Sequence, residues 1–296
     1  AMDEILAYAE RRTRAALARL PDGESEAVDA LEWRGGEIEL RVRATVRGEE
    51  LALDFSGSAG QIEGNLNCPL SVTRSAAFYA VRVVCDPDGP PSAGAWRPVG
   101  VDAPEGSLLN ARFPAAVAAG NVETSSRVAD LVFAALAPFA PVPAAGQGTM
   151  NNLTFSSGSE WTYYETIGGG QGACPDGDGP SAVHVAMSNT LNTPVEALET
   201  QFPLRVRELS LRRGSGGAGA HRGGDGIVRE LEALAPMAYT LIAERRALAP
   251  RGREGGADGA PGADTLNGEP IPAKGGGRLA PGDRLRVETP GGGGLG

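Results

Sequence analysis

The stretch from Gly148 to Glu196 reads GTMNNLTFSSGSEWTYYETIGGGQGACPDGDGPSAVHVAMSNTLNTPVE. Small amide and hydroxyl side chains gather at its two ends, around 149–154 and 188–193. A glycine run and one of only two histidines in the chain, His184, lie between them. An unpaired buried amide costs about 1–3 kcal/mol, and glycine lets backbone approach closely. The stretch therefore predicts a neutral, hydrogen-bonding pocket; the alternative is that Asn and Thr stabilise their own loops.

The composition of the 296 residues limits the class of fold and of partner. The chain contains 43 Gly and 22 Pro, which favours many short strands and tight turns over a helical bundle. Its formal net charge is −10, and no basic run exceeds two residues. Nucleic-acid binding depends on concentrated positive charge. We therefore expect no nucleic-acid partner.

The cysteines and the apolar runs indicate a compartment. Cys68, Cys85 and Cys174 are far apart, and no CxxC occurs, so neither a disulfide framework nor a zinc ribbon is indicated. We expect reduced thiols, with Cys85 as a packing residue in a helix. The sequence contains no run of 18 apolar residues, so no membrane span is predicted. The charged N-terminus is unlike a signal peptide. The expected location is the cytoplasm.

Periodicity predicts an α+β fold, with β-rich mixed sheets and three main helices in the first half. The expected helices cover Asp3–Leu20, Ser71–Cys85 and 124–139, the last capped by Thr124. A hairpin is expected over 37–55, and the later strands are expected at 204–211 with a bulge, 227–234, 238–243 and 285–287. Asn267-Gly268 is typical of a type I′ turn. We expect residues 1–200 to form an α+β domain with the pocket, and 201–296 a mainly β, glycine-rich domain.

The segment from Gly214 to Gly226 contains seven glycines in thirteen residues. A flexible linker would also be glycine-rich. This segment, however, includes His221, Arg222 and Asp225 and leads directly into an expected strand. We expect it to be ordered and packed closely on another backbone.

Standard catalytic motifs are missing from the sequence. There is no GxxxxGK[ST] loop, no GxSxG elbow and no HExxH. The glycine run Gly168-Gly169-Gly170 leads to Cys174-Pro175 and not into a helix, so it is not a dinucleotide fingerprint. Nothing in the spacing of the histidines and carboxylates requires a metal site, so no metal ligand is predicted.

The candidate residues come from the polar and irregular segments. His184 is suited to acid–base chemistry near neutral pH, and we expect it on a strand, facing opposite to Ser188. Glu165 follows aromatic residues, and Glu123 lies just before an expected helix start, where free amides can hold an oxygen. Each residue has a structural alternative. His184 could be a hydrogen-bonded sheet histidine, Glu165 could form a salt bridge, and Glu123 could be an ordinary carboxylate that stabilises a helix start. The predicted catalytic residues are Glu123, Glu165 and His184, and the predicted substrate-binding residues are Asn121, Asn151, Asn189 and Asn192.

Several segments together resemble the hydantoinase B family. They are DFSGSAGQIEGNLNCPLSVTRSAAFYA, APEGSLLNARFPAAVAAGNVETSSRVAD, QGTMNNLTF, YYETIGGGQGA, MSNTLNTPVEALE, RRGSGGAGAHRGGDGIVRE and the closing TPGGGGLG. The family includes the B-type component of N-methylhydantoinase, the C-terminal region of ATP-dependent 5-oxoprolinase, and the large subunits of acetone and acetophenone carboxylases.

The resemblance implies an ATP-dependent cyclic amidase that opens hydantoin or 5-oxoproline with a hydantoinase A-type subunit. It also implies that a His and Asp metal cluster lies in the family's N-terminal half, which this chain is expected to lack. On this basis the chain is the C-terminal part of a B-type subunit. It would bind no cofactor itself, and ATP and a divalent metal would serve the complete enzyme. The alternatives are part of an ATP-dependent ketone carboxylase and a non-catalytic scaffold for the A-type subunit.

Overall fold

The computed structural model describes residues 2–296, which belong to two compact units, Ala1–Val142 (unit 1) and Pro143–Gly296 (unit 2). The α+β class is confirmed. The boundary lies at residue 142, whereas the sequence predicted it at residue 200. The reason is strand pairing: β5 (Asn152–Ser156) pairs with β9 (Met237–Ile242), so residues on both sides of position 200 share one sheet.

The sheet of unit 1 contains four strands in the order β1 (Gly23–Trp33), β2 (Gly36–Arg47), β3 (Glu50–Asp54) and β4 (Val99–Asp102). The first three form an antiparallel meander, and β4 pairs parallel to β3. The predicted hairpin is confirmed as β2 and β3, because alternate residues of β2 from Ile38 to Val46 are apolar and buried. The sequence analysis missed β1, whose GESEAVDALEW lacks a clean apolar alternation.

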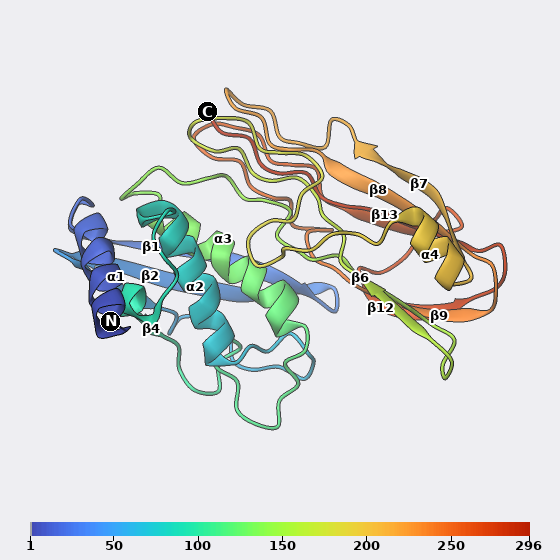
Figure 1. Ribbon diagram of the computed structural model, residues 1–296, viewed down its shortest axis with the longest axis horizontal. Helices are drawn as coiled ribbons and strands as arrows, with labels where there is room; N and C mark the ends of the chain where they lie inside the picture. Colours follow the sequence, from blue (N-terminus) through green and yellow to red (C-terminus); the bar gives the residue numbers. More distant parts are fainter. Residues whose placement is uncertain (1) are drawn as a thin grey trace. The chain divides into compact units, whose positions relative to one another are not determined.

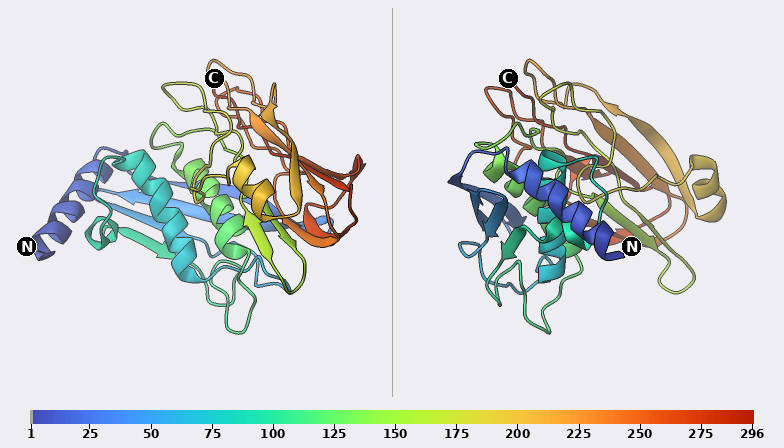
Figure 2. Two further views of the ribbon diagram at one scale, coloured as in Figure 1. Left: turned by 45° about the vertical axis from the view of Figure 1, so that its right-hand side comes forward. Right: turned by 60° about the vertical axis from the view of Figure 1, so that its left-hand side comes forward.

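Three helices complete unit 1: α1 (Met2–Leu17), α2 (Leu70–Cys85) and α3 (Ser125–Leu136). In Figure 1, α2 and α3 lie on one face of the sheet, with α3 next to β1 and β2 and with α2 beside α3. Because α3 is covered by both the sheet and α2, all of its residues except Ala134 are buried. A short 3-10 turn, η1 (Ala93–Trp96), packs on α1. The other views of Figure 2 show the same helical layer.

Unit 2 is built on two antiparallel sheets. One has the order β11 (Glu269–Pro270), β10 (Ala263–Leu266), β13 (Arg284–Glu288), β8 (Gly226–Ala233) and β7 (Leu204–Arg212); the other has the order β12 (Lys274–Leu279), β9, β5 and β6 (Thr162–Glu165). Apolar side chains from both sheets form one core, which includes Phe155, Leu231, Leu241 and Leu285. The short helix α4 (Val195–Gln201) precedes β7.

Two local predictions for unit 2 are confirmed. The register of β7 on β8 shifts between Val206 and Glu208, which is the expected bulge. Asn267 and Gly268 have φ of 52° and 86° and connect β10 to β11, as a type I′ turn requires. Among residues 2–296, no helix is both long enough and apolar enough to cross a bilayer.

A bundle of extended glycine-rich segments lies at one end of unit 2, and we call it the glycine core. It contains residues 144–147, 168–173, 179–182, 215–226, 251–260 and 290–296, which bond backbone to backbone outside the named strands. The amides of the last segment donate in turn to three neighbours: Gly291 to Ala260, Gly292 to Gly224 and Gly293 to Ala145, then Gly294 to Ala257 and Leu295 to His221. From Gly291 to Leu295 this period of three, with no bonds inside the segment, is that of a polyproline II-type helix. Gly296 departs from it, because its amide donates to Arg253.

The glycine core has no room for side chains at its contacts. A Cβ on Gly292 would lie 1.9 Å from the carbonyl oxygen of Gln171, and one on Gly223 would lie 2.0 Å from that of Gly292. Gly216 and Gly224 meet carbonyl oxygens at 1.9 Å in the same way. The prediction that residues 214–226 are ordered and packed on another backbone is therefore confirmed.

Substituting one of these glycines tests the packing. We expect Gly292→Ala to lower the free energy of unfolding by at least about 3 kcal/mol, at the upper end of overpacking costs, because backbone must move. Gly177→Ala is the matched control, since its Cβ meets nothing within 4 Å. Urea unfolding followed by circular dichroism measures both. Equal midpoints for the two variants would contradict the close packing.

The thiols give a second test. Cys85 ends α2 and is buried, as predicted, and burial raises the pKa of Cys68 and of Cys85 to about 11. Only the thiolate reacts with disulfide reagents, so at pH 8 these two thiols are almost wholly in the unreactive form. We expect the half-buried Cys174 to react first with an aromatic disulfide, and the other two only as pH rises toward 11 or the chain unfolds. Stoichiometric fast reaction of all three at pH 8 would contradict this.

Candidate functional site

Glu165, a predicted catalytic residue, is the centre of a buried ion pair in unit 2. It ends β6, and Arg229 on β8 donates to it twice, Nε to Oε1 at 2.8 Å and Nη2 to Oε2 at 3.0 Å. The Tyr163 hydroxyl donates to Oε2 at 2.9 Å. The two charged side chains are 3% and 0% exposed. The pair thus joins one sheet to the other, which is the salt-bridge role named above as the alternative.

Asn192 is brought to Glu165. Its Nδ2 donates to the carbonyl oxygen of Thr166 at 3.0 Å and approaches Oε2 of Glu165 at 3.4 Å. The loop from residue 182 to 194 is therefore fastened, near its C-terminal end, to the end of β6. Asn189 lies exposed on the same loop, and Leu191 beside it is 95% exposed.

Asn151 is fully buried in a different network. Its Nδ2 donates to Gln147 Oε1 at 2.9 Å and to the carbonyl oxygen of Ile167 at 3.0 Å, while its Oδ1 accepts from Arg246 at 2.7 Å. Arg246 in turn forms a two-contact ion pair with Asp264. Three hydrogen-bonding positions of the Asn151 amide are therefore occupied, which is typical of an amide that holds its own loops in place.

His184 does not lie on a strand, and it does not face away from Ser188; both predictions are wrong. Its neighbour Val183 makes one isolated bridge to Gly169, and Ala182 and Ala186 adopt positive φ of 56° and 55°. These left-handed residues end the extended path, so side chains no longer alternate. Nδ1 of His184 instead hydrogen bonds to Ser188 Oγ. Burial lowers the pKa of His184.

Asn121 and Glu123 lie in unit 1, in the π-helical turn η2 (Gly120–Thr124) that runs into α3. Two of the amides that were predicted to be free at this helix start are hydrogen-bonded. Gly120 donates to the carbonyl oxygen of Asn65, and Glu123 donates to that of Ala119 at 2.8 Å. Thr124 occupies the N-cap position of α3, as predicted, but its side chain does not cap the helix, because the hydroxyl donates to the carbonyl oxygen of Leu66 at 2.5 Å.

The seven predicted residues thus belong to two units. The structure joins Glu165 with Asn192, and it places His184 and Asn189 on the loop that Asn192 fastens. The sequence-based prediction that one cavity is lined by Asn121, Glu123, Asn151, Glu165, Asn189 and Asn192 stays a prediction. The sequence analysis missed Arg229, Tyr163 and Ser188 as functional partners. The sequence did contain one indication for Arg229, because this charged residue directly follows the apolar start of a strand, Gly226–Val228.

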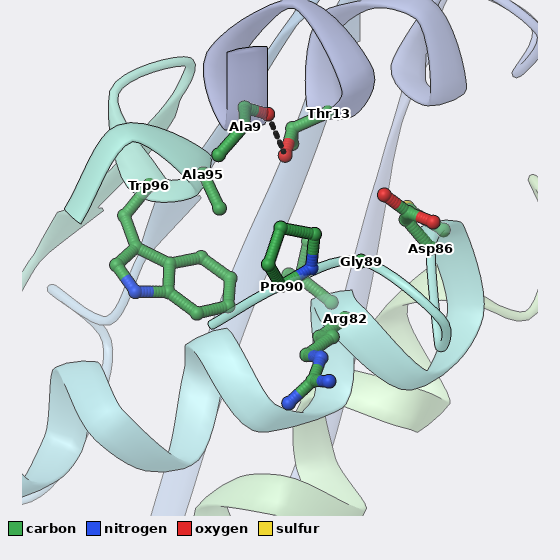
Figure 3. A pocket seen from close by; sticks show the side chains of 10 residues that line it. Ala9, Thr13, Arg82, Asp86, Gly89, Pro90, Ala95 and Trp96 are labelled. Carbon is green, nitrogen blue, oxygen red and sulfur yellow. Dashed lines mark hydrogen bonds between the residues drawn. The ribbon is translucent and has the colours of Figure 1, made fainter. Parts of the chain in front are cut away.

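An apolar pocket lies in unit 1, between α1, α2 and η1 (Figure 3). None of the predicted site residues lines it. Trp96 and Pro90 line one part of it, and Arg82 and Asp86 another. Asp86 is bound to Arg12 at 2.6 Å. The sequence analysis did not predict this pocket.

The donor set does not fit a metal ion. Over residues 2–296, no three His, Cys, Asp or Glu side chains come close enough together to hold one. The buried carboxylates of unit 2 are held by cations instead: Glu165 by Arg229, Asp264 by Arg246 and Glu244 by Lys274.

Comparison with known proteins identifies the family. The sequence profile described as Hydantoinase B/oxoprolinase matches residues 1–296. The chain belongs to the hydantoinase B/oxoprolinase family. This confirms the resemblance that the motifs indicated.

Two curated relatives illustrate the match. The chain is 40% identical to 5-oxoprolinase 1 of Arabidopsis thaliana over 267 residues, covering 88% of this chain and 21% of the relative. It is 33% identical over 277 residues to a protein of Pseudomonas sp. (strain NS671) provisionally named as the B-type component of a D-/L-hydantoinase, covering 88% of this chain and 47% of the relative. The chain thus spans about a fifth of one and about half of the other.

A solved structure shows the same fold. The crystal structure of an ATP-dependent caprolactamase from Pseudomonas jessenii superimposes with a TM-score of 0.87 at 26% identity. The match covers 99% of this chain and 55% of that protein.

Removing the charge of Glu165 tests its role between the sheets. We expect Glu165→Gln to lower the free energy of unfolding by about 3–5 kcal/mol, because it leaves the Arg229 guanidinium buried without its counter-charge. The double variant Glu165→Leu with Arg229→Met should recover much of this loss, since apolar replacement of a buried pair is often neutral. Chemical denaturation of the wild type and of both variants measures these changes. An unchanged midpoint for Glu165→Gln would contradict the structural role.

Proposed function

We propose that this chain is the B-type part of an ATP-dependent enzyme that opens a cyclic amide of the hydantoin or 5-oxoproline kind. The observation that carries the proposal is the family match over residues 1–296, together with relatives named as a 5-oxoprolinase and as a hydantoinase component of the B type. The similar fold of a protein named ATP-dependent caprolactamase, another enzyme of a cyclic amide, supports it.

The partner in this proposal is a hydantoinase A-type subunit that uses ATP. The chain has no phosphate-binding loop motif, and its described residues offer no metal cluster. In this proposal, ATP and the divalent metal are bound by other parts of the assembly. Because ATP is abundant inside cells, we also propose the cytoplasm as the location.

The role that we propose for this chain is to position the substrate and to move or share a proton. An oriented substrate reacts faster because the translational and rotational entropy has been lost on binding. Neutral amides such as Asn192 and Asn189, on a loop fastened to Glu165, are suited to hold a polar ring. His184 on the same loop is the residue suited to proton transfer. Glu165 supports the loop and is not available as a base, because Arg229 and Tyr163 occupy it.

The test is turnover of hydantoin, 5-oxoproline or caprolactam with ATP and Mg²⁺ or Mn²⁺. We expect no turnover by residues 1–296 alone, and turnover once the A-type subunit and the remaining family segments are added. Acetone with bicarbonate serves as the control substrate. Carboxylation of acetone without ring opening would show that the assembly is a carboxylase and not an amidase. ATP-dependent ring opening by the isolated chain would contradict the assignment of ATP use to the A-type subunit.

A further inference from the structure

His184 and Ser188 form an isolated polar pair in the loop of unit 2. Nδ1 of His184 hydrogen bonds to Oγ of Ser188, which is 6% exposed. The other ring nitrogen, Nε2, is buried and has no hydrogen-bond partner among residues 2–296. The second histidine differs, because Nδ1 of His221 lies 3.8 Å from Oδ1 of Asp178.

Hydrogen-bond satisfaction decides where the proton of the neutral ring lies. If Ser188 donates to Nδ1, the proton is on Nε2, and a single group, Nε2–H, is left without a partner. If Nδ1–H donates to Ser188 instead, two groups are left without a hydrogen-bond partner: the buried hydroxyl hydrogen of Ser188 and the lone pair of Nε2. Each unsatisfied buried polar group destabilises the fold. The first arrangement is therefore favoured.

The loop holds this pair in a defined geometry. Ala182 and Ala186, two residues to either side of His184, occupy left-handed conformations that non-glycine residues rarely adopt, and such strain gathers at functional sites. The glycine core fixes one end of the loop, since Ala182 donates to the carbonyl oxygen of Asp225 at 2.9 Å. Asn192 fixes the other end at Thr166.

The charged groups around the loop are engaged with partners other than the imidazole. Of those on the segments bonded to this loop, Glu165 and Arg229 bind each other, and Asp225 accepts from the amide of Gly216 at 2.9 Å. Burial alone lowers the pKa of His184, so the neutral ring is the form present at pH 7.

We propose that Ser188 is a positioning residue that holds His184 as the Nε2–H tautomer. Nε2–H then donates to an acceptor oxygen of the ligand, either a carbonyl oxygen or an anionic oxygen. The identity of this ligand rests on the proposed function, whereas the tautomer does not. Donors preset toward a developing negative charge accelerate amide chemistry strongly.

Nitrogen NMR of the chain labelled with ¹⁵N-histidine tests the tautomer directly. Only two histidines contribute signals, and His221→Gln assigns them. We expect Nε2 of His184 to show the protonated shift and Nδ1 the unprotonated shift at pH 7. Ser188→Ala should convert this to a mixture of tautomers, and Ser188→Thr, which keeps a hydroxyl, should restore the Nε2–H form. Thr190→Ala, on the exposed part of the same loop, is the matched control.

A proton on Nδ1 in the wild-type chain, or a Ser188→Ala spectrum equal to the wild type, would overturn the proposal. If Ser188→Ala does not fold, the wild-type and Ser188→Thr spectra still decide it. In the assembled enzyme we expect His184→Phe to lower kcat by about 10²–10³, as removal of an oxyanion donor does, and His184→Gln, which keeps an N–H donor, to recover part of this. An effect of His184→Phe below about twofold in a working enzyme overturns the donor role without affecting the proposed function. An inactive wild-type assembly counts against the proposed function, and the spectra still decide the tautomer.

Discussion

Close backbone contact in the glycine core is the constraint on which unit 2 depends. Gly292 lies against Gln171, Gly224 against Pro180 and Gly216 against Gly223, each at a distance that excludes a Cβ. Segments more than a hundred residues apart in sequence share these contacts. Side-chain burial cannot stabilise such a bundle, so its stability comes from satisfied backbone hydrogen bonds and from dense van der Waals contact. Glycine is also the residue that loses the most conformational entropy on ordering. These contacts are necessary because they must offset that loss.

The glycine core and the ion pair between the sheets together hold the loop of His184. Residues 179–183 bond to Arg222, Asp225 and Gly169 on one side of this loop. On the other side Asn192 bonds to the end of β6, where Arg229 fixes Glu165. The loop is thus fixed at both ends by rigid parts, while its tip around Leu191 stays exposed. A site that positions a substrate needs this kind of support, because small displacements of the reacting groups reduce the rate strongly.

Local patterns in the sequence predicted those parts of the fold that local physics decides. The apolar alternation of β2, the bulge in β7 and the Asn267-Gly268 turn depend on a few adjacent residues. The orientation of His184 was predicted wrongly, because it depends on two left-handed alanines that no composition rule indicates. The partner of Glu165 lies 64 residues away, and pairing at that range leaves no mark in a single sequence. Asn151, Glu165 and Asn192 were predicted as site residues, but their hydrogen-bonding partners were not predicted.

Hydrogen exchange with peptide resolution tests most directly whether the glycine core is one cooperative element that supports the His184 loop. We expect peptides covering 168–173, 215–226 and 290–296 to exchange together and slowly, at the rate of global unfolding of unit 2, because each segment bonds to the others. In Gly292→Ala all three, and the loop at 182–188 with them, should lose protection. Rapid exchange of 290–296 in the wild type, with the other segments still protected, would contradict a single cooperative core.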